Sequence, residues 1–294
     1  MSRTKSRRAP AKVNLYLHVA APDARRYHPL QSLVTFADIG DEVSLIETGG
    51  SADNLRSDLS LSGAFAEGLG TGEDNLILKA VRAFEAAAGL RVDRHALHLA
   101  KNLPIASGLG GGSADAGATL HLLREAYAPD MADEALGAIA AKTGADGVMC
   151  LWAKPSLAEG YGERLTPVSL PSVPAVLINP GVACSTPAVY GGFDAQGQFS
   201  SLDAVAEDIV NVEVLTAFLK QTRNDLQAPA IALQPVIGEV LTRLEAQPET
   251  LFARMSGSGA TCFALCRSDE EAEVLSRRMQ LLRPGAWVTP CRLG

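Results

Sequence analysis

Apolar and polar residues alternate in several short stretches of the chain, which is the pattern of a half-buried β-strand. Residues 13–19 show it first, with Val or Leu at every second position. A strand here would place Lys12 and Asn14 together on its other face. Such a pair most often meets solvent, so the pattern alone leaves its role open. Further strands are predicted over residues 30–36, 42–47, 59–61, 95–101, 175–179, 261–265 and 286–291.

Apolar residues at helical spacing predict helices between these strands. An alanine-rich stretch follows Ser113 and continues to Tyr127, so we expect Ser113 to be the N-cap of a helix. Residues 191–201 are expected to form a loose loop. Further helices are predicted over residues 75–88 (closed by Gly89), 133–142, 212–220, 235–246 and 269–282.

The second half of the chain contains two strand–helix–strand passages, which predict an α/β sandwich with helices on one face. At 294 residues the chain exceeds the usual size of one compact core. The Gly-rich stretch that begins at Glu159 is a suitable boundary. We therefore expect two domains, residues 1–160 and 161–294.

Composition and charge restrict the classes of function. Hydrophobic residues make up 47% and charged residues 20%, as in an ordinary globular protein. The formal net charge is −7 and no dense basic run follows residues 3–12, which disfavours a nucleic-acid surface. No apolar run is long enough to span a bilayer, so we expect no membrane segment.

The cysteines and histidines show no pattern of a metal site or a disulfide framework. The five cysteines include no Cys-x-x-Cys pair, which favours a reducing cytoplasmic location. His95 and His98 would point to opposite faces of a strand, so a zinc site is not expected.

The stretch from Leu103 to Leu120 carries the strongest chemical signal. Four glycines, at positions 108, 110, 111 and 112, precede Ser113 and the alanine-rich helix. A backbone without side chains can approach an anion closely, and a helix N-terminus directs N–H groups at it. The P-loop would need Lys after the last Gly, and the dinucleotide fingerprint would need Gly at 113. The stretch therefore predicts a phosphate-binding loop of another kind rather than a flexible linker.

Other candidates are weak when taken singly. Asp146 next to Gly147 is typical of a turn. The pair Tyr27 and His28 could be surface residues at a strand entrance. A second glycine-rich segment, Gly257 to Gly259, lies in the other half of the chain, and two such segments lining one cleft would suit a nucleotide and a second substrate.

Three segments together resemble one family. Residues 9–15 (Ala-Pro-Ala-Lys-Val-Asn-Leu), 104–114 and 255–260 (Met-Ser-Gly-Ser-Gly-Ala) resemble, in order and spacing, the three motifs of the superfamily of galactokinase, homoserine kinase, mevalonate kinase and phosphomevalonate kinase, the GHMP kinases. Tyr27-His28, residues 144–146 and residues 224–226 are similar to those members that phosphorylate the 2-hydroxyl of 4-diphosphocytidyl-2-C-methyl-D-erythritol. That reaction belongs to the non-mevalonate route to isoprenoid precursors.

The resemblance implies an α+β fold of two domains, the N-terminal one like ribosomal protein S5 domain 2 and the C-terminal one ferredoxin-like. It implies ATP and Mg²⁺ as cofactors, with Asp146 as general base and Lys12 stabilising the transferred phosphate. It implies that Asn14, Tyr27, His28, Tyr190, Gly257, Ser258 and Gly259 contact the substrate. The ATP loop would consist of Pro104, Ile105, Ala106, Ser107, Gly108, Leu109, Gly110, Gly111, Gly112, Ser113 and Ala114.

Two departures from the family pattern leave alternatives open. The family usually has Asp-Gly before the Tyr-His pair, where this chain has Arg25 and Arg26, and Val-Pro after the Asp, where this chain has Gly147 and Val148. A glycine next to the base could make the site mobile and turnover poor. The alternatives are another small-molecule kinase of the superfamily, or a nucleotide-binding homologue that has lost turnover. The expected partners are ATP and a small molecule, with no nucleic acid or membrane, for a monomer or weak homodimer.

Overall fold

The computed structural model describes residues 4–48, 59–199, 201–202 and 209–294. The chain forms two compact units. The strands β1 (Thr4–Asn14) and β3 (Leu30–Glu47) contribute residues to both of them. The division into domains at residues 1–160 and 161–294 therefore remains a prediction. Unit 1 comprises Met1–Ala11, Gly40–Ile105 and Gly110–Ala153, and unit 2 comprises Lys12–Ile39, Ala106–Leu109 and Lys154–Gly294.

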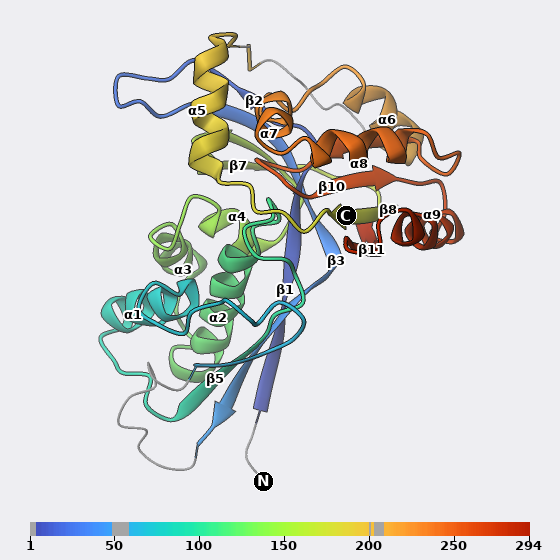
Figure 1. Ribbon diagram of the computed structural model, residues 1–294. Helices are drawn as coiled ribbons and strands as arrows, with labels where there is room; N and C mark the ends of the chain where they lie inside the picture. The colour runs from blue at the N-terminus through green and yellow to red at the C-terminus, as the bar shows by residue number, and fades with distance from the viewer. Residues whose placement is uncertain (1–3, 49–58, 200, 203–208) are drawn as a thin grey trace. The chain divides into compact units, whose positions relative to one another are not determined.

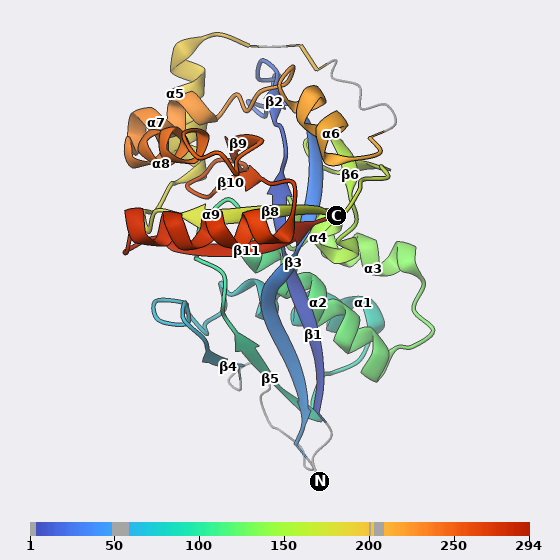
Figure 2. The same cartoon turned by 90° about the vertical axis from the view of Figure 1, so that its right-hand side faces the viewer.

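Unit 1 contains a small mixed sheet with helices on one face (Figures 1 and 2). The second half of β3 pairs antiparallel with β5 (His95–Ala100), so that Glu42 lies opposite Ala100. The strand β4 (Leu59–Ser62) pairs parallel with β5. The helices pack against one another: α1 (Leu76–Ala88), α2 (Gly111–Tyr127), α3 (Asp133–Ala140) and α4 (Gly147–Trp152).

Unit 2 begins with an antiparallel group of strands around the first half of β3. On one side, β2 (His18–Val19) places His18 opposite Gln31 of β3. On the other, β6 (Ser156–Gly160) pairs with β3 and continues to β7 (Arg164–Pro167). Of the candidate site residues, Asn14 lies at the end of β1, whereas Tyr27 and His28 lie in the loop between β2 and β3.

The rest of unit 2 is a ferredoxin-like layer. Its antiparallel strands lie in the order β11, β8, β10, β9, while the chain visits them as β8, β9, β10, β11. That order and the helices between the strands give the β-α-β-β-α-β arrangement. The strands are β8 (Val173–Asn179), β9 (Phe252–Met255), β10 (Cys262–Leu265) and β11 (Trp287–Leu293), and the helices are α5 (Thr186–Gln196), α6 (Val212–Leu219), α7 (Gln227–Leu233), α8 (Val236–Glu245) and α9 (Asp269–Leu282).

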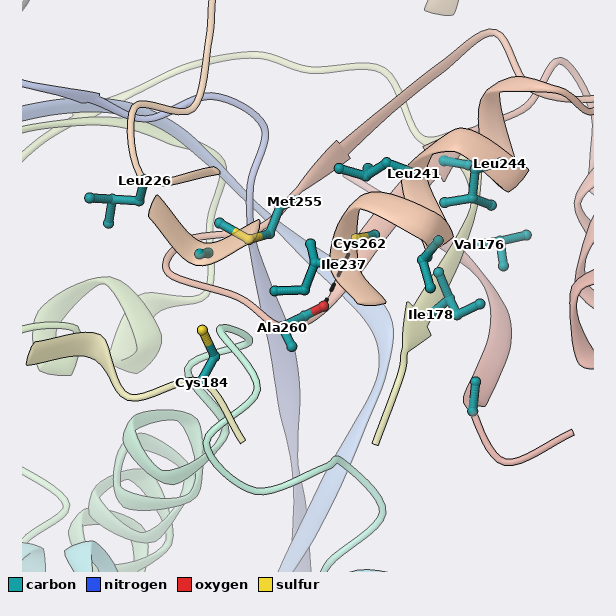
Figure 3. Packing of buried hydrophobic residues seen from close by; sticks show 14 of the residues in the cluster. Val176, Ile178, Cys184, Leu226, Ile237, Leu241, Leu244, Met255, Ala260 and Cys262 are labelled. Carbon is teal, nitrogen blue, oxygen red and sulfur yellow. Dashed lines mark hydrogen bonds between the residues drawn. The ribbon is translucent and has the colours of Figure 1, made fainter. Parts of the chain in front are cut away.

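An apolar cluster holds α5, α7, α8 and α9 to one face of this layer. Val176 and Ile178 of β8 point into it together with Cys262 of β10, and α8 contributes Ile237 and Leu241 (Figure 3). Residues of α5, α7 and α9 complete the same cluster. The sequence-based expectation of a sandwich with helices on one face is confirmed.

Most predicted elements are present, and two differ from the prediction. Strands predicted over residues 30–36 and 42–47 form one strand, β3, of 18 residues. Residues 191–196 are not a loose loop but the second half of α5, because Val189 and Phe193 lie one turn apart and are both buried in the apolar cluster. The packing of those two residues outweighs the low helix propensity of Gly191 and Gly192. Residue 200 lies outside the described residues.

Candidate active site

Lys12 and Asn14 are buried, each with 6% of its surface exposed, which excludes the solvent-facing interpretation. The ammonium of Lys12 donates a 2.9 Å hydrogen bond to Oδ1 of Asn14. The amide nitrogen of that side chain donates to the hydroxyl of Ser32 at 2.8 Å, and Ser32 donates in turn to the carbonyl of Tyr16 at 2.6 Å. The side chain of Asn14 is therefore held in one orientation, with its oxygen toward Lys12.

The middle of the glycine-rich loop runs beside this pair in unit 2. The backbone N–H of Lys12 donates to the carbonyl of Leu109 at 2.8 Å, and that of Thr261 donates to the carbonyl of Ser107 at 3.1 Å. Gly108 has φ +79, and a methyl group on it would lie 2.5 Å from the carbonyl oxygen of Ser256. Only glycine fits at this point of the loop, both for its backbone angle and for lack of space.

The second glycine-rich segment meets the same residues. The hydroxyl of Ser256 accepts a hydrogen bond from the backbone N–H of Asn14 at 3.1 Å and donates to the carbonyl of Gly108 at 3.2 Å. A methyl group on Gly257 would lie 3.2 Å from Oδ1 of Asn14. Three segments that are far apart in the sequence thus converge on one place in unit 2. Next to it, the hydroxyl groups of Ser258 and Thr186 lie 2.7 Å apart.

Asn224 holds the second glycine-rich segment in place. Its side-chain amide donates to the carbonyl groups of Met255 and Gly257, both at 2.8 Å, and its oxygen accepts from the N–H of Leu226 at 3.0 Å. The sequence suggests only a turn or cap here, and the bond from Leu226 to the side chain of Asn224 is of that kind. The two longer-range bonds were not foreseen, and the only signal for them in the sequence is the Asn-Asp-Leu triplet of the resemblance.

Arg254 holds the backbone next to Asn14 in place, a role that the sequence did not indicate. It lies in β9, is buried, and donates to the carbonyl groups of Leu15 at 3.0 Å and Leu219 at 2.9 Å, as well as to Thr222. Burial lowers its pKa to about 10. Arg254 thereby fixes the backbone directly after Asn14.

The start of α2 forms the phosphate-binding candidate of unit 1. The helix begins at Gly111, with Gly110 as N-cap at φ +63, so the expectation that Ser113 is the N-cap is wrong. Glycine at position 110 can adopt the left-handed conformation, which lets the helix begin three residues earlier than the sequence suggests. Ser113 lies in the first turn, whose N–H groups have no partner within the helix and can bind an anion.

Asp146 directly follows a turn that lies close to the start of α2. It is the half-buried N-cap of α4, and a methyl group on the nearby Gly144 would lie 3.8 Å from the hydroxyl oxygen of Ser113. The helices α2 and α4 can approach closely because Gly117 of α2 has no side chain. A methyl group at that position would lie 3.0 Å from the carbonyl oxygen of Cys150 in α4. Unit 1 therefore brings the turn that precedes Asp146 close to the first turn of α2.

Gly147, after Asp146, is tightly packed. A methyl group on it would lie only 2.0 Å from the carbonyl oxygen of Ala140, and its own N–H donates to the carbonyl of Gly144 at 3.0 Å. The sequence suggested a mobile position here. The structure instead shows a glycine that is required by close contact, so that the backbone on which Asp146 sits is well held.

Tyr27, His28 and Tyr190 lie at a second place in unit 2. The ring of His28 packs against Tyr190, with centroids 5.3 Å apart, and against Phe193 of the same helix, α5. Its Nδ1 donates to the carbonyl of Ala20 at 2.9 Å, and its Nε2 lies 3.1 Å from a carboxylate oxygen of Asp194. Tyr27 is 65% exposed.

The loop before Tyr27 is ordered by a carboxylate. Asp23 accepts hydrogen bonds from the N–H groups of Arg25 at 2.9 Å and Tyr27 at 3.0 Å, and from the hydroxyl of Tyr161 at 2.8 Å. The N–H of Tyr27, then the hydroxyl of Tyr161, lower the pKa of Asp23 to about 2. Arg26, at the place of the family's glycine, adopts φ +66. The turn before Tyr27 thus keeps a glycine-like backbone without a glycine.

The described part of the chain contains no cluster of three or more His, Cys, Asp or Glu side chains arranged to hold a metal ion. Within the same residues, no helix has the length and apolar character needed to cross a bilayer.

Comparison with known proteins identifies both halves of the chain. Residues 75–154 match the N-terminal domain of GHMP kinases, and residues 203–282 match the C-terminal domain of GHMP kinases. The 4-diphosphocytidyl-2-C-methyl-D-erythritol kinase of Caulobacter vibrioides is 50% identical over 289 residues, covering 97% of this chain and 98% of that protein. The enzyme of the same name from Hyphomonas neptunium is 48% identical over 90% of this chain and 88% of its own length.

Solved structures agree with this. A crystal structure of 4-(cytidine 5'-diphospho)-2C-methyl-D-erythritol kinase superposes with a TM-score of 0.78 at 31% identity and covers 99% of both chains. A homoserine kinase from Cytophaga hutchinsonii shares the fold, with a TM-score of 0.62 at 18% identity over 99% of this chain and 94% of that one. Given sequence identity of this level over nearly the full length, the chain belongs to the 4-diphosphocytidyl-2-C-methyl-D-erythritol kinases, a family of the GHMP kinase superfamily.

Proposed function

We propose that this chain transfers the γ-phosphoryl group of ATP to the 2-hydroxyl of 4-diphosphocytidyl-2-C-methyl-D-erythritol, a step in the formation of isoprenoid precursors. The observation that carries the proposal is the convergence of Lys12, Asn14, Gly108 and Ser256 through hydrogen bonds of 2.9–3.2 Å. These residues belong to the three motifs on which the resemblance rests. The names of the relatives supply the identity of the acceptor.

The reaction needs positioning and charge stabilisation rather than a covalent intermediate. The acceptor oxygen attacks the γ-phosphorus, the bond from that phosphorus to the β,γ-bridging oxygen breaks, and ADP leaves. Asp146 takes the proton of the hydroxyl group as general base. The ammonium of Lys12, oriented by Asn14, stabilises the negative charge that develops on the transferred group.

ATP would be held through its phosphates by the loop of residues 104–114. The N–H groups in the first turn of α2 suit the phosphate oxygens, and the glycines allow close approach. Mg²⁺ would enter with ATP, because this ion commonly binds through phosphates, waters and one or two protein oxygens rather than in a protein cage. The hydroxyl of Ser113 is an oxygen donor in that turn. Bound Mg²⁺ would neutralise phosphate charge.

The cytidyl group would bind at Tyr27, His28 and Tyr190. The exposed ring of Tyr27 offers a face for stacking, and the ring of Tyr190 is fixed against His28. Because both ring nitrogens of His28 already face oxygen atoms of Ala20 and Asp194, its main-chain groups are the ones left to bind the edge of the base. Gly257, Ser258 and Gly259 would line the same substrate near the sugar or diphosphate.

The free thiols of the cysteines, all five of which are buried, support a reducing cytoplasmic location for this activity. The oligomeric state that we propose, a monomer or weak homodimer, is checked by light scattering.

The direct experiment is to incubate the purified protein with ATP, Mg²⁺ and the cytidyl substrate, and to follow ADP release and the new phosphomonoester by ³¹P NMR. Homoserine and mevalonate serve as competing acceptors. We expect turnover of the cytidyl substrate alone, and its loss in Lys12→Ala and Asp146→Asn but not in Lys154→Ala, a change at an exposed lysine. Binding of ATP without ADP release would instead identify a homologue without turnover, and phosphorylation of another acceptor would identify a different kinase.

A further inference from the structure

Unit 1 contains a buried cluster of three charged side chains that the proposed reaction does not use. The ammonium of Lys101, just after β5, lies 2.5 Å from Oδ2 of Asp41 in β3 and 2.8 Å from Oδ2 of Asp115 in α2. The side chains of Lys101, Asp41 and Asp115 are exposed by only 3%, 0% and 4%. Such complete burial of three charges is expensive.

The cluster joins the two ends of the phosphate-binding loop. Oδ1 of Asp41 accepts hydrogen bonds from the backbone N–H groups of Asn102 at 2.6 Å and Leu103 at 2.8 Å, where the chain enters the loop. Asp115 lies in the second turn of α2, where the chain has left the loop. Lys101 binds both carboxylates, so it connects the entry and the exit.

The cluster also lies directly against the first residue of α2. A methyl group on Gly111 would lie 3.0 Å from the ammonium nitrogen of Lys101 and 3.5 Å from Oδ2 of Asp41. A side chain at position 111 would therefore crowd the ammonium of Lys101. Any movement of the ammonium would be passed on to the first turn of the helix, whose N–H groups are the phosphate-binding groups.

A purely stabilising role does not account for the cluster. A cation beside a helix N-terminus is repelled by the helix dipole. No hydrogen-bond donor among the described residues reaches Oδ1 of the buried Asp115. Buried ion pairs typically give little net stability compared with apolar residues of the same volume. What the cluster does provide is a fixed geometry between residues 102–103 and the start of α2.

We infer that Asp41, Lys101 and Asp115 are positioning residues that hold the loop entry and the first turn of α2 in the geometry required for the phosphates of ATP. The inference rests on the proposed function in that it takes ATP as the ligand of this loop. The candidate groups for the cytidyl substrate, Tyr27, His28 and Tyr190, belong to unit 2. A change in the cluster should therefore affect the two substrates differently.

The test compares Asp115→Asn, which keeps an oxygen for Lys101 but removes the charge, with Thr119→Val one turn further along α2. Thr119 is fully buried and its hydroxyl donates to the carbonyl of Asp115, so its loss disturbs the helix interior without touching the cluster's ammonium. Steady-state kinetics give the KM values for ATP and for the acceptor, and nucleotide titration gives ATP affinity without the acceptor.

We expect Asp115→Asn to raise the KM and the Kd for ATP about tenfold, with the acceptor KM within about twofold of the original. Thr119→Val should leave both KM values unchanged, and Asp115→Glu should restore part of the ATP affinity. A folded Asp115→Asn protein with unchanged ATP affinity would overturn the inference, as would equal loss for both substrates. If Asp115→Asn does not fold, Lys101→Arg, which keeps the charge but displaces it, gives the same readout. A wild-type protein that binds no ATP would instead contradict the proposed function.

Discussion

The backbone N–H of Asn14 donates a 3.1 Å hydrogen bond to the hydroxyl of Ser256, a residue 242 positions further along the chain. The same hydroxyl donates to the carbonyl of Gly108. One serine therefore connects the strand that carries Lys12 to both glycine-rich segments. The orientation of the Lys12 ammonium then depends on the side chain of Asn14, which is itself fixed by Ser32.

Replacing Asn14 should reduce turnover even if the acceptor still binds. Asn14→Ala removes the oxygen that holds the ammonium of Lys12, and a hydrogen bond to a charged group contributes about 1.5–3 kcal/mol. We expect kcat to fall roughly 10- to 100-fold, and Asn14→Asp, which retains the oxygen, to fall less. Rapid-quench kinetics measure the chemical step directly. If Asn14→Ala kept the original kcat, the orientation of Lys12 would not depend on this contact.

Asn224 should affect both stability and the acceptor. In Asn224→Ala the buried carbonyl groups of Met255 and Gly257 lose their donor, and each unsatisfied buried group costs about 1–3 kcal/mol. We expect a lower urea midpoint, and a raised acceptor KM with an unchanged ATP KM, because the Gly257 segment would be less well placed. Asn102→Ala, at an exposed asparagine side chain, is the matched control. An unchanged acceptor KM in a destabilised Asn224→Ala protein would limit Asn224 to a structural role.

Local signals were sufficient for most of the fold and for the helix that follows the glycine-rich loop. The alternation around Val13 and the glycines before Ser113 are visible within a few residues, and the elements that they predict are present. The exact start of α2 was missed by three residues, since a glycine N-cap at Gly110 has no distinctive side chain. The full length of α5 depends on the burial of Val189 and Phe193 in the apolar cluster, which no local pattern shows.

Long-range partners could not be predicted from the sequence. Arg254 binds carbonyl groups of Leu15 and Leu219, and backbone acceptors carry no sequence identity. Lys101 and Asp41 are 60 positions apart, and no motif in the sequence around either residue indicates the pairing. The burial of Lys12 and the close packing of Gly147 likewise depend on neighbours that only the folded chain provides.

Gly147 and Gly191 should respond oppositely to the same substitution. Gly147→Ala places a methyl group 2.0 Å from the carbonyl oxygen of Ala140, so the backbone of α4 must shift, at a cost of about 1–3 kcal/mol. In α5, a methyl group on Gly191 meets no atom within 4 Å, and alanine is the better helix former by about 1 kcal/mol. Thermal melting should show a lower Tm for Gly147→Ala and an equal or higher Tm for Gly191→Ala. A Gly147→Ala protein with the original Tm would contradict the close packing of Gly147 against Ala140.

Tyr27 should determine affinity for the cytidyl acceptor. Its ring is largely exposed, and stacking of a base on an aromatic ring contributes about 1–3 kcal/mol. We expect Tyr27→Ala to raise the acceptor KM roughly 5- to 150-fold. Tyr27→Phe keeps the ring, so its acceptor KM should stay close to that of the original protein. The ATP KM should be unchanged in both variants. A Tyr27→Ala protein with an unchanged acceptor KM would place the base elsewhere and favour an acceptor without one.

The pH dependence of stability should identify the charge state of Asp115. Burial raises its pKa to about 7, and of the two charged groups beside it Lys101 lowers the pKa while Asp41 raises it further. The folded protein therefore holds a proton on Asp115 more tightly than the unfolded chain does. As a result, the contribution of Asp115 to the free energy of unfolding falls as the pH rises from about 4 to about 7, and it is constant above pH 7.

Urea unfolding of the original protein and of Asp115→Asn between pH 4.5 and 8 measures this contribution. The difference in the free energy of unfolding should shift in favour of Asp115→Asn up to about pH 7. Asp23→Asn is the control, because the pKa of Asp23 is shifted in the opposite direction, down to about 2. The stabilising contribution of Asp23 is therefore complete above about pH 4 and is lost only as the pH falls toward 2. The difference for Asp23→Asn should thus be constant over this range. A constant difference for Asp115→Asn as well would mean that Lys101 keeps Asp115 ionised throughout, and that the cluster carries a net negative charge beneath the phosphate-binding turn.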